Sequence, residues 1–293
     1  MAKNKLTIIV PVYGDWPSLK ECIESLQQTT NADTHNVILA NDCGPEADKI
    51  EANILKLIKG QSNFRYVRNE QNLGFVGNCN NAVMNLDSTK NDIVLLNSDT
   101  KVTPGAFEEM AAVLASDERI ATVSPRSNNA TICTFPLSAI HDHGIEASRS
   151  FRLFERQKQK LPRYSIAPTG HGFCLMIRRS VIKKYGLFDT AFGKGYGEEV
   201  DFCRRVQKHG WKSVIAHHAY VFHLEARSFS LETKAELIMN SRKIIEARYP
   251  EYKSEVTQYI QEALTLESRL FGSKSHRLKQ AVRVRAKRLL RRP

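Results

Sequence analysis

Two groups of polar side chains in this sequence have the types and spacing that metal-assisted chemistry requires. The first group directly follows the apolar run 93–96 and consists of Asn97, Ser98 and Asp99. The second lies a hundred residues later at the start of a predicted helix and consists of Glu198, Glu199 and Asp201. An oxygen ligand can hold a divalent cation that neutralises a diphosphate leaving group. A separate carboxylate can take a proton from an attacking hydroxyl.

Each group also has a simpler interpretation. An Asn-x-Asp sequence after a strand often forms only a turn, because these side chains hydrogen-bond to their own backbone. Acids in the first turn of a helix complement the helix dipole, and Asp201 can pair with Arg205 one turn further on. The pattern alone leaves open which of the three acids in the second group would act as a base.

The elements that must position these groups alternate between short apolar runs and amphipathic stretches. The runs predict strands at 6–10, 37–40, 64–67 and 93–96, each followed by a helical pattern. Such alternation predicts an α/β fold with a parallel sheet covered on both faces. Further strands are predicted at 120–124, 172–177, 214–216 and 220–222, and helix from about residue 230. Residues 125–165 show little periodicity, which is typical of a lid, a binding loop or disorder.

Polar residues follow the first four predicted strands, at 11–14, 41–44, 69–74 and 97–99. Ligands of open α/β sheets bind outside the carboxyl ends of the strands, so these segments are expected to form a site. An Asx turn is the alternative for Asp42, and Gly74 can simply permit a tight turn. Gly193, Gly195 and Gly197 predict a mobile approach to the second acidic group.

Composition predicts one domain with an appendage for this chain of 293 residues. Nine of the 43 Lys and Arg residues fall between Lys274 and Arg292, where there is no Asp or Glu, so most of the net charge of +12 belongs to this segment. The six cysteines lack C-x-x-C spacing, which favours a reduced, cytosolic compartment. No signal peptide and no run of about twenty apolar residues is apparent.

An ordered set of short motifs resembles the family 2 glycosyltransferases, particularly their rhamnosyltransferase-like branch. The match covers roughly residues 5–228 and consists of the segments 10–13, 41–42, 72–75, 96–99, 186–189 and 197–202, and His223. The resemblance implies a GT-A fold, with a Rossmann-like, mostly parallel sheet flanked by helices. It implies a catalytic domain at 1–228, with a helical C-terminal extension at 229–293, and inverting transfer from a nucleotide-activated sugar.

The resemblance also implies roles for individual residues. Asp99 and His223 would hold Mn²⁺ or Mg²⁺, and Glu199 occupies the place of the family's catalytic Asp, with Glu198 and Asp201 as the other candidates for the base. The nucleotide would be bound by Pro11, Val12, Tyr13, Asp42, Asn72, Gly74, Asn97 and Ser98. Two residues depart from the family pattern: Asn97 replaces the first Asp of a D-x-D motif, and Glu199 is one methylene longer than Asp. A packed histidine without a ligand is the alternative for His223.

This reading predicts a hexosyltransferase that extends a lipid-linked, cell-surface glycan, with dTDP-rhamnose as the favoured donor and UDP-hexoses next. Residues 274–293 form a basic amphipathic pattern that suits the anionic inner face of a membrane and lacks the interleaved aromatics of a nucleic-acid surface. The expected location is therefore cytoplasmic and peripheral on the membrane, and a solvated helix or disordered tail is the alternative. A metal-dependent nucleotidyltransferase and a non-catalytic sugar-nucleotide-binding module are the rival functions. The sequence leaves homo-oligomerisation open.

Overall fold

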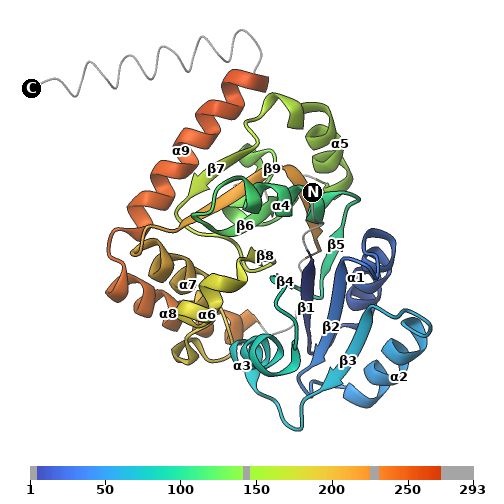
Figure 1. Cartoon of the computed structure of the whole chain (residues 1–293). Helices are drawn as coiled ribbons and strands as arrows, with labels where there is room; N and C mark the ends of the chain where they lie inside the picture. The colour runs from blue at the N-terminus through green and yellow to red at the C-terminus, as the bar shows by residue number, and fades with distance from the viewer. Residues whose placement is uncertain (1–4, 141–145, 225–230, 272–293) are drawn as a thin grey trace, which may run out of the picture.

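Strands and helices alternate along the first half of the chain in the computed structural model, which describes residues 5–140, 146–224 and 231–271 (Figure 1). The strands are β1 (Leu6–Val12), β2 (His35–Asn41), β3 (Phe64–Arg68), β4 (Asp92–Leu96), β5 (Thr100–Val102), β6 (Ile120–Arg126), β7 (Tyr164–Ala167), β8 (Cys174–Ile177) and β9 (Lys212–His223). The helices are α1 (Trp16–Thr29), α2 (Ala47–Leu57), α3 (Gly74–Asn81), α4 (Ala106–Ser116), α5 (Ala147–Gln157), α6 (Arg179–Tyr185), α7 (Glu198–Gln207), α8 (Leu231–Arg248) and α9 (Tyr252–Phe271).

All nine strands belong to one mixed sheet, in the order β3-β2-β1-β4-β8-β6-β9-β5, with β7 paired to β9. Strands β1 to β4 are mutually parallel, as the alternating pattern predicts. Strand β8 is antiparallel to both β4 and β6, and β9 is parallel to β6. Two reversals restore the direction, so β9 ends at the same edge of the sheet as β1, β2 and β4. The α/β class predicted from the sequence is confirmed.

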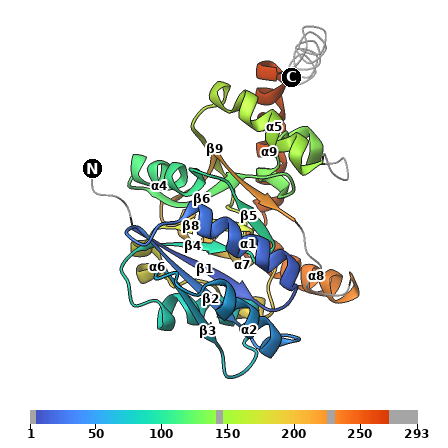
Figure 2. The same ribbon diagram turned by 90° about the vertical axis from the view of Figure 1, so that its right-hand side faces the viewer.

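Helices cover both faces of the sheet, because its buried side chains alternate between two cores. In β1, Ile8 and Val10 face one core while Ile9 faces the other. Helices α1, α2, α4 and α9 pack on the first face. Helices α3, α6, α7 and α8 pack on the second face, so the sheet lies between two helical layers (Figure 2). All six cysteines are free thiols, and every one except the half-buried Cys43 is buried in this arrangement.

Three parts of the fold differ from the prediction. The run 172–177 is a strand only from Cys174 onward, and the two strands expected at 214–216 and 220–222 are the single strand β9. The segment 125–165, which showed little periodicity, contains α5 and β7. The three-residue strand β5 was not predicted, because it pairs with β9, more than a hundred residues away in sequence.

Helices α8 and α9 of the expected C-terminal extension pack directly on the sheet layer. Ile245 of α8 and Tyr249, which directly follows this helix, join the core beside α7, and Tyr259 of α9 joins the opposite core. Glu267 of α9 is buried and forms an ion pair of 3.1 Å with Arg126 of β6. Within the described ranges, no helix has the length and apolarity that a membrane span needs. The division at residue 228 stays a prediction, and residues 274–293 lie outside the described part of the chain.

Candidate active site at the carboxyl edge of the sheet

The predicted site residues gather at the edge where β1, β2, β4 and β9 end. Strands β1, β2 and β4 are parallel neighbours, so the segments that follow them lie at one edge. Strand β5 pairs with the last residues of β9, with Thr100 opposite His223. This pairing brings the end of β9 beside the turn at Asn97–Asp99, although the two segments are more than a hundred residues apart in sequence.

The loops after β1 and β2 pack backbone to backbone beside the predicted nucleotide residues. Val12 is buried in the sheet, Pro11 is half-buried and Tyr13 is exposed. A side chain at Gly44 would place its Cβ 1.6 Å from the carbonyl oxygen of Tyr13, so only glycine allows this approach. Gly44 was not among the predicted site residues, although it lies within the polar end of the second predicted strand.

Asp42 joins three segments of this edge through its hydrogen bonds. Its Oδ1 accepts from the backbone N–H of Leu73 at 2.8 Å and from Nδ2 of Asn69 at 2.9 Å. Nδ2 of Asn72 donates to the Asp42 carbonyl oxygen at 2.8 Å. The Asx turn is made instead by Asn41, whose Oδ1 accepts from the N–H of Cys43. Burial raises the pKa of Asp42, against the opposing effect of the hydrogen bonds from Leu73 and Asn69.

The segment 69–74 is shaped by asparagines and one glycine. Oδ1 of Asn72 accepts from the N–H of Gly74, which has a φ of 72° and so adopts the left-handed conformation that glycine tolerates. The buried amide of Asn69 bonds to Asn78 and accepts from Asn81 on α3. Sequence reasoning missed this amide network, and the only available signal was the density of asparagines in α3.

Asn97 and Ser98 are half-buried at the end of β4. The backbone N–H of Asn97 donates to the carbonyl oxygen of Phe173 at 2.9 Å, and its carbonyl accepts from the Thr100 hydroxyl at 2.7 Å. These bonds fix the backbone of the turn that carries Asp99. Asn97, Ser98 and Asp99 therefore form a turn, as the simpler interpretation predicted, and this turn lies at the edge where the site is expected.

Asp99 and His223 form a pair, with Oδ1 of Asp99 at 3.5 Å from Nε2 of His223. Nδ1 of His223 lies 2.7 Å from the carbonyl oxygen of Asn129, and its backbone exchanges hydrogen bonds with the Asn128 amide. A carbonyl at Nδ1 favours a proton there and leaves the Nε2 lone pair toward Asp99. Among the described residues no cluster of three or more His, Cys, Asp or Glu side chains suits a metal ion.

His171 and the next residue, Gly172, link this pair to the second acidic group, and the two residues are called the His171–Gly172 wall below. Its ring centroid lies 6.4 Å from that of His223 and 5.3 Å from that of Phe173. Burial lowers the pKa of His171 to about 3, so its ring is neutral. His171 was not predicted as a site residue. The only signal would have been its position before Gly172, at the start of the sixth apolar run.

Glu199 lies next to this wall, in the first turn of α7. Its carboxyl carbon would lie 3.6 Å from a Cβ added at Gly172, the residue after His171. Backbone hydrogen bonds from Gly172 and Gly197 lower the pKa of Glu199, but burial has the larger effect and raises it. Glu199 is therefore linked to the Asp99–His223 pair through Gly172 and His171, and its own pKa is raised, as suits a general base.

Glu198 and Asp201 have different surroundings from Glu199. Glu198 is 4% exposed, its Oε2 has no hydrogen-bond partner among the described residues, and burial together with the Glu199 charge raises its pKa strongly. Asp201 is bonded to Arg248, the last residue of α8, at 2.7 Å and to the hydroxyl of the next residue, Tyr249, at 2.9 Å. It also pairs with Arg205 at 3.4 Å, as the helical spacing predicts. The bonds of Asp201 therefore join α7 to α8.

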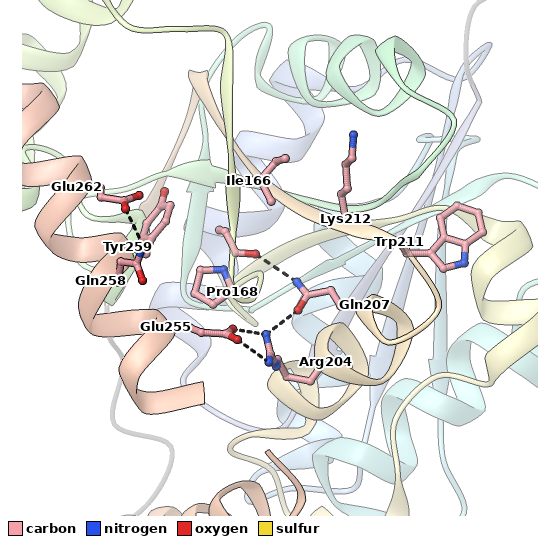
Figure 3. A pocket seen from close by; sticks show the side chains of 11 residues that line it. Ile166, Pro168, Arg204, Gln207, Trp211, Lys212, Glu255, Gln258, Tyr259 and Glu262 are labelled. Atoms are coloured by element: carbon pink, nitrogen blue, oxygen red, sulfur yellow. Dashed lines mark hydrogen bonds and ion pairs between the residues drawn. The ribbon is translucent and has the colours of Figure 1, made fainter. Parts of the chain in front are cut away.

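A cavity of about 320 Å³ lies away from this edge, between β7, the last turns of α7, and α9 (Figure 3). Arg204 and Glu255 face each other across it at 2.5 Å, and Gln207 donates to the Ala167 carbonyl oxygen. The residues predicted for binding or catalysis do not line it. Its ion pairs join α7 to α9 and stand apart from the acidic groups.

A family model and two curated relatives resemble this chain in sequence. The model described as glycosyl transferase family 2 matches residues 7–186. Two curated proteins, both called N-acetylglucosaminyl-diphospho-decaprenol L-rhamnosyltransferase, come from the CDC 1551 and H37Rv strains of Mycobacterium tuberculosis. Each is 23% identical to this chain over 254 residues, covering 79% of this chain and 80% of the relative.

Two solved structures share the fold at low sequence identity. One is a mannosyltransferase from Pyrobaculum calidifontis in complex with GDP-Man and Mn²⁺, with a TM-score of 0.62, 12% identity, and coverage of 98% of this chain and 81% of that protein. The other is GalNAc-T7 with UDP, GalNAc and Mn²⁺, with a TM-score of 0.61, 13% identity, and coverage of 89% of this chain and 55% of that protein. These likenesses confirm the predicted GT-A-like fold.

Proposed function

The chain belongs to glycosyl transferase family 2, and from that premise we propose that it transfers a sugar, with inversion, from a nucleotide-diphosphate donor to a hydroxyl of a growing glycan. The observation that carries this proposal is the juxtaposition of two carboxylate groups at one sheet edge. Asp99 lies 3.5 Å from His223, and Glu199 lies beside the His171–Gly172 wall next to that pair.

Asp99 and His223 would hold the divalent cation, Mn²⁺ or Mg²⁺, in this proposal. A carboxylate oxygen and an imidazole nitrogen suit Mn²⁺, and the remaining positions would be left to donor phosphates and water. When bound, the cation supplies positive charge to the departing diphosphate. The Mn²⁺ named with both solved structures supports the choice of metal. Asn97 leaves this site with one acidic residue fewer than a D-x-D motif would provide.

Glu199 would accept the proton of the attacking hydroxyl. A single base on the face opposite the nucleotide produces inversion, and no covalent intermediate on the enzyme is needed. Glu199 fits because its raised pKa combines with a position near the ligand pair. Asp201 fits poorly, since Arg205, Arg248 and Tyr249 already use its oxygens. Glu198 is the alternative base.

The nucleotide would lie over the ends of β1, β2 and β4. Asp42 would bind the base or the ribose. The other residues proposed to contact the nucleotide are Pro11, Val12, Tyr13, Asn72, Gly74, Asn97 and Ser98. The rhamnosyltransferase names of the curated relatives support dTDP-rhamnose as the first donor to test, with UDP-hexoses next. The diphospho-decaprenol in those names supports a lipid-linked acceptor, and hence a peripheral location on the inner face of a membrane, reached through residues 274–293.

A panel of sugar nucleotides tests the proposal. Purified protein is incubated with Mn²⁺, an acceptor analogue and each donor, and free nucleoside diphosphate is measured with and without chelator. Acceptor-dependent release with one donor is expected, and loss of release in chelator supports the metal. Pyrophosphate consumed or produced in place of nucleoside diphosphate would indicate a nucleotidyltransferase. Donor binding without turnover for every donor would indicate a binding module.

A further inference from the structure

Helix α5 has an apolar face and a cationic face. Ser150 and Phe154 are buried, and Phe151 packs between Tyr220 and Phe222 of β9, with ring centroids at 5.2 Å from each. The exposed face carries a row of arginines at spacings of three and four residues, namely Arg149, Arg152 and Arg156. Those spacings place the three guanidinium groups on one side of the helix.

The three arginines form no ion pair among the described residues, whereas two neighbouring cations are paired. Lys158 pairs with Glu155 at 2.8 Å, and Arg163 forms two hydrogen bonds with Glu109 at 2.7 and 3.0 Å. In the described part of the chain, Arg152 donates to the Ser148 hydroxyl and to no acid. The exposed face of α5 therefore keeps its positive charge and its hydrogen-bond donors for an external partner. The guanidinium group matches phosphate oxygens with two parallel donors.

The end of α9 packs on the aromatic cluster that also receives the apolar face of α5. Leu270 and Phe271 contact the aromatic cluster that contains Phe154, and the rings of Phe271 and Phe135 lie 5.9 Å apart. Figures 1 and 2 both show α5 beside the end of α9. Phe271 is followed in the sequence by the segment with nine Lys and Arg residues and no acid. The arginine face of α5 therefore lies where this basic segment begins.

Helix α5 lies near the proposed active site through its apolar face. Phe222, which packs against Phe151 of α5, directly precedes His223 in β9. A membrane bound to the exposed arginine face would thus be separated from this part of β9 by helix α5. This arrangement suits an acceptor that is itself anchored in a bilayer.

We propose that Arg149, Arg152 and Arg156 form a folded docking surface for the phospholipid headgroups of an anionic membrane, and that it holds helix α5 and the neighbouring end of β9 near the bilayer. The function suggested for this surface depends on the proposed lipid-linked acceptor. The evidence for the surface itself is that the three arginines are exposed and unpaired among the described residues, and that the basic segment begins nearby, after α9. Attraction of clustered basic residues to anionic lipids is local and weakens with salt.

Vesicle binding of the full chain tests the surface. The variant Arg149→Gln, Arg152→Gln, Arg156→Gln is compared with wild type and with a control, Lys49→Gln, Lys56→Gln, Lys59→Gln. The control removes the same charge from exposed residues in and beside α2, at the opposite end of the molecule. Cosedimentation is measured with phosphatidylcholine vesicles and with vesicles that also contain phosphatidylglycerol. Thermal unfolding of each variant checks that its fold is retained.

We expect the α5 variant to bind the anionic vesicles at least about fivefold more weakly than both wild type and the control, and the difference to shrink at high salt. Equal binding by the two variants would overturn the proposal, because the effect would then belong to net charge alone. Wild-type binding that ignores phosphatidylglycerol, or that is found for an oligonucleotide and not for vesicles, would overturn it as well.

Donor-dependent nucleotide release separates this surface from the proposed function. Release to a soluble acceptor should be the same in the α5 variant, the control and wild type, because the six substituted residues are outside the site. Vesicle binding as expected without any transfer would refute the proposed function and leave the surface standing. Sugar transfer by wild type, together with unchanged vesicle binding by the α5 variant, would refute the docking surface and leave the proposed function standing.

Discussion

At the scale of single residues, the three acids at the start of α7 differ in what surrounds them. Asp201 is occupied by two arginines and a tyrosine, Glu198 is enclosed, and Glu199 lies beside the wall that leads to His223. The resemblance placed Glu199 first and left Glu198 and Asp201 as alternatives. The pairing of Asp201 with Arg205 was predicted from helical spacing, but its partners Arg248 and Tyr249 lie almost fifty residues away, where no local pattern reveals them.

Replacement of Glu199 by Gln is expected to lower the turnover number by about 10²-fold or more with donor binding retained, because general base catalysis contributes about 10² to 10⁴. Glu198→Gln should have a smaller effect on turnover, and Asp201→Asn should mainly lower the midpoint of urea unfolding. Single-turnover rates and donor dissociation constants of the three variants provide the measurement. An inactive Glu198→Gln enzyme beside an active Glu199→Gln enzyme would move the base to Glu198.

The pH dependence of transfer follows from the raised pKa of Glu199. A base must be ionised, and burial holds the folded-state pKa above the ordinary value of 4.5. Activity should therefore be low at acid pH and rise as pH increases through a midpoint above 4.5. The measurement is log kcat/KM against pH for wild type and Glu199→Gln. An acid limb at or below 4.5, or the same limb in the variant's residual rate, would contradict the assignment.

At the scale of elements, the sequence predicted the parallel half of the sheet well and the other half poorly. Strands β1, β2 and β4 are buried on both faces and were therefore recognisable as continuous apolar runs. Strand β9 was divided into two because His217 interrupts its apolar run. His217 is buried because Arg126 donates to its Nδ1 at 2.9 Å and Ser165 meets its Nε2 at 3.0 Å. Neither partner is near in sequence, so periodicity could not reveal one continuous strand.

Helix α5 was not predicted from the sequence, because the residues that stabilise it are also distant in the sequence. Its sequence is mostly polar, and its buried stripe is narrow because only Ser150 and Phe154 are fully enclosed. Its aromatic partners are Phe135, which lies in a loop, and Tyr220 and Phe222 of β9. The motifs at the strand ends, in contrast, were readable because parallel strands bring their carboxyl ends together whatever else the fold contains.

The contact between the loops after β1 and β2 makes a prediction at this scale. Gly44→Ala should weaken nucleotide binding by roughly tenfold, or about 1.4 kcal/mol, because the new Cβ would force the Tyr13 backbone away. Gly14→Ala is the matched control, since nothing lies within 4 Å of a Cβ at that position. Calorimetric titration with nucleoside diphosphates measures the dissociation constants of both variants. Equal affinities in the two variants would mean that the Tyr13 loop does not contribute to the nucleotide site.

At the scale of the whole molecule, α9 is fastened to the sheet by a buried polar cluster. Arg126 is 1% exposed and donates to Glu267, to His217 and to the carbonyl oxygen of Thr134. Oε2 of Glu267 accepts from the backbone N–H of Leu137 at 2.7 Å. Burial raises the pKa of Glu267 although Arg126 lowers it. Helix α9 therefore stabilises the sheet and the loop 131–140 together.

Removal of the Glu267 carboxylate should lower the free energy of unfolding of the protein. Glu267→Ala leaves Arg126 buried without its ion-pair partner, which typically costs about 3 to 5 kcal/mol. Glu262→Ala, one turn earlier and exposed, should change the free energy of unfolding by less than about 0.5 kcal/mol. Urea unfolding of the full chain measures both changes. A Glu267→Ala protein as stable as the Glu262→Ala control would show that α9 is an independent appendage.

The measurement that tests the central claim most directly is the metal dependence of transfer by wild type and Asp99→Asn, using the donor that the sugar-nucleotide panel selects. Asp99 supplies the one carboxylate of the Asp99–His223 pair, so its charge is expected to hold the cation that the departing diphosphate needs. We predict Mn²⁺-dependent release in wild type, inhibition by chelator, and no detectable transfer by Asp99→Asn at matched thermal stability. Near wild-type transfer by Asp99→Asn, insensitive to chelator, would contradict the account.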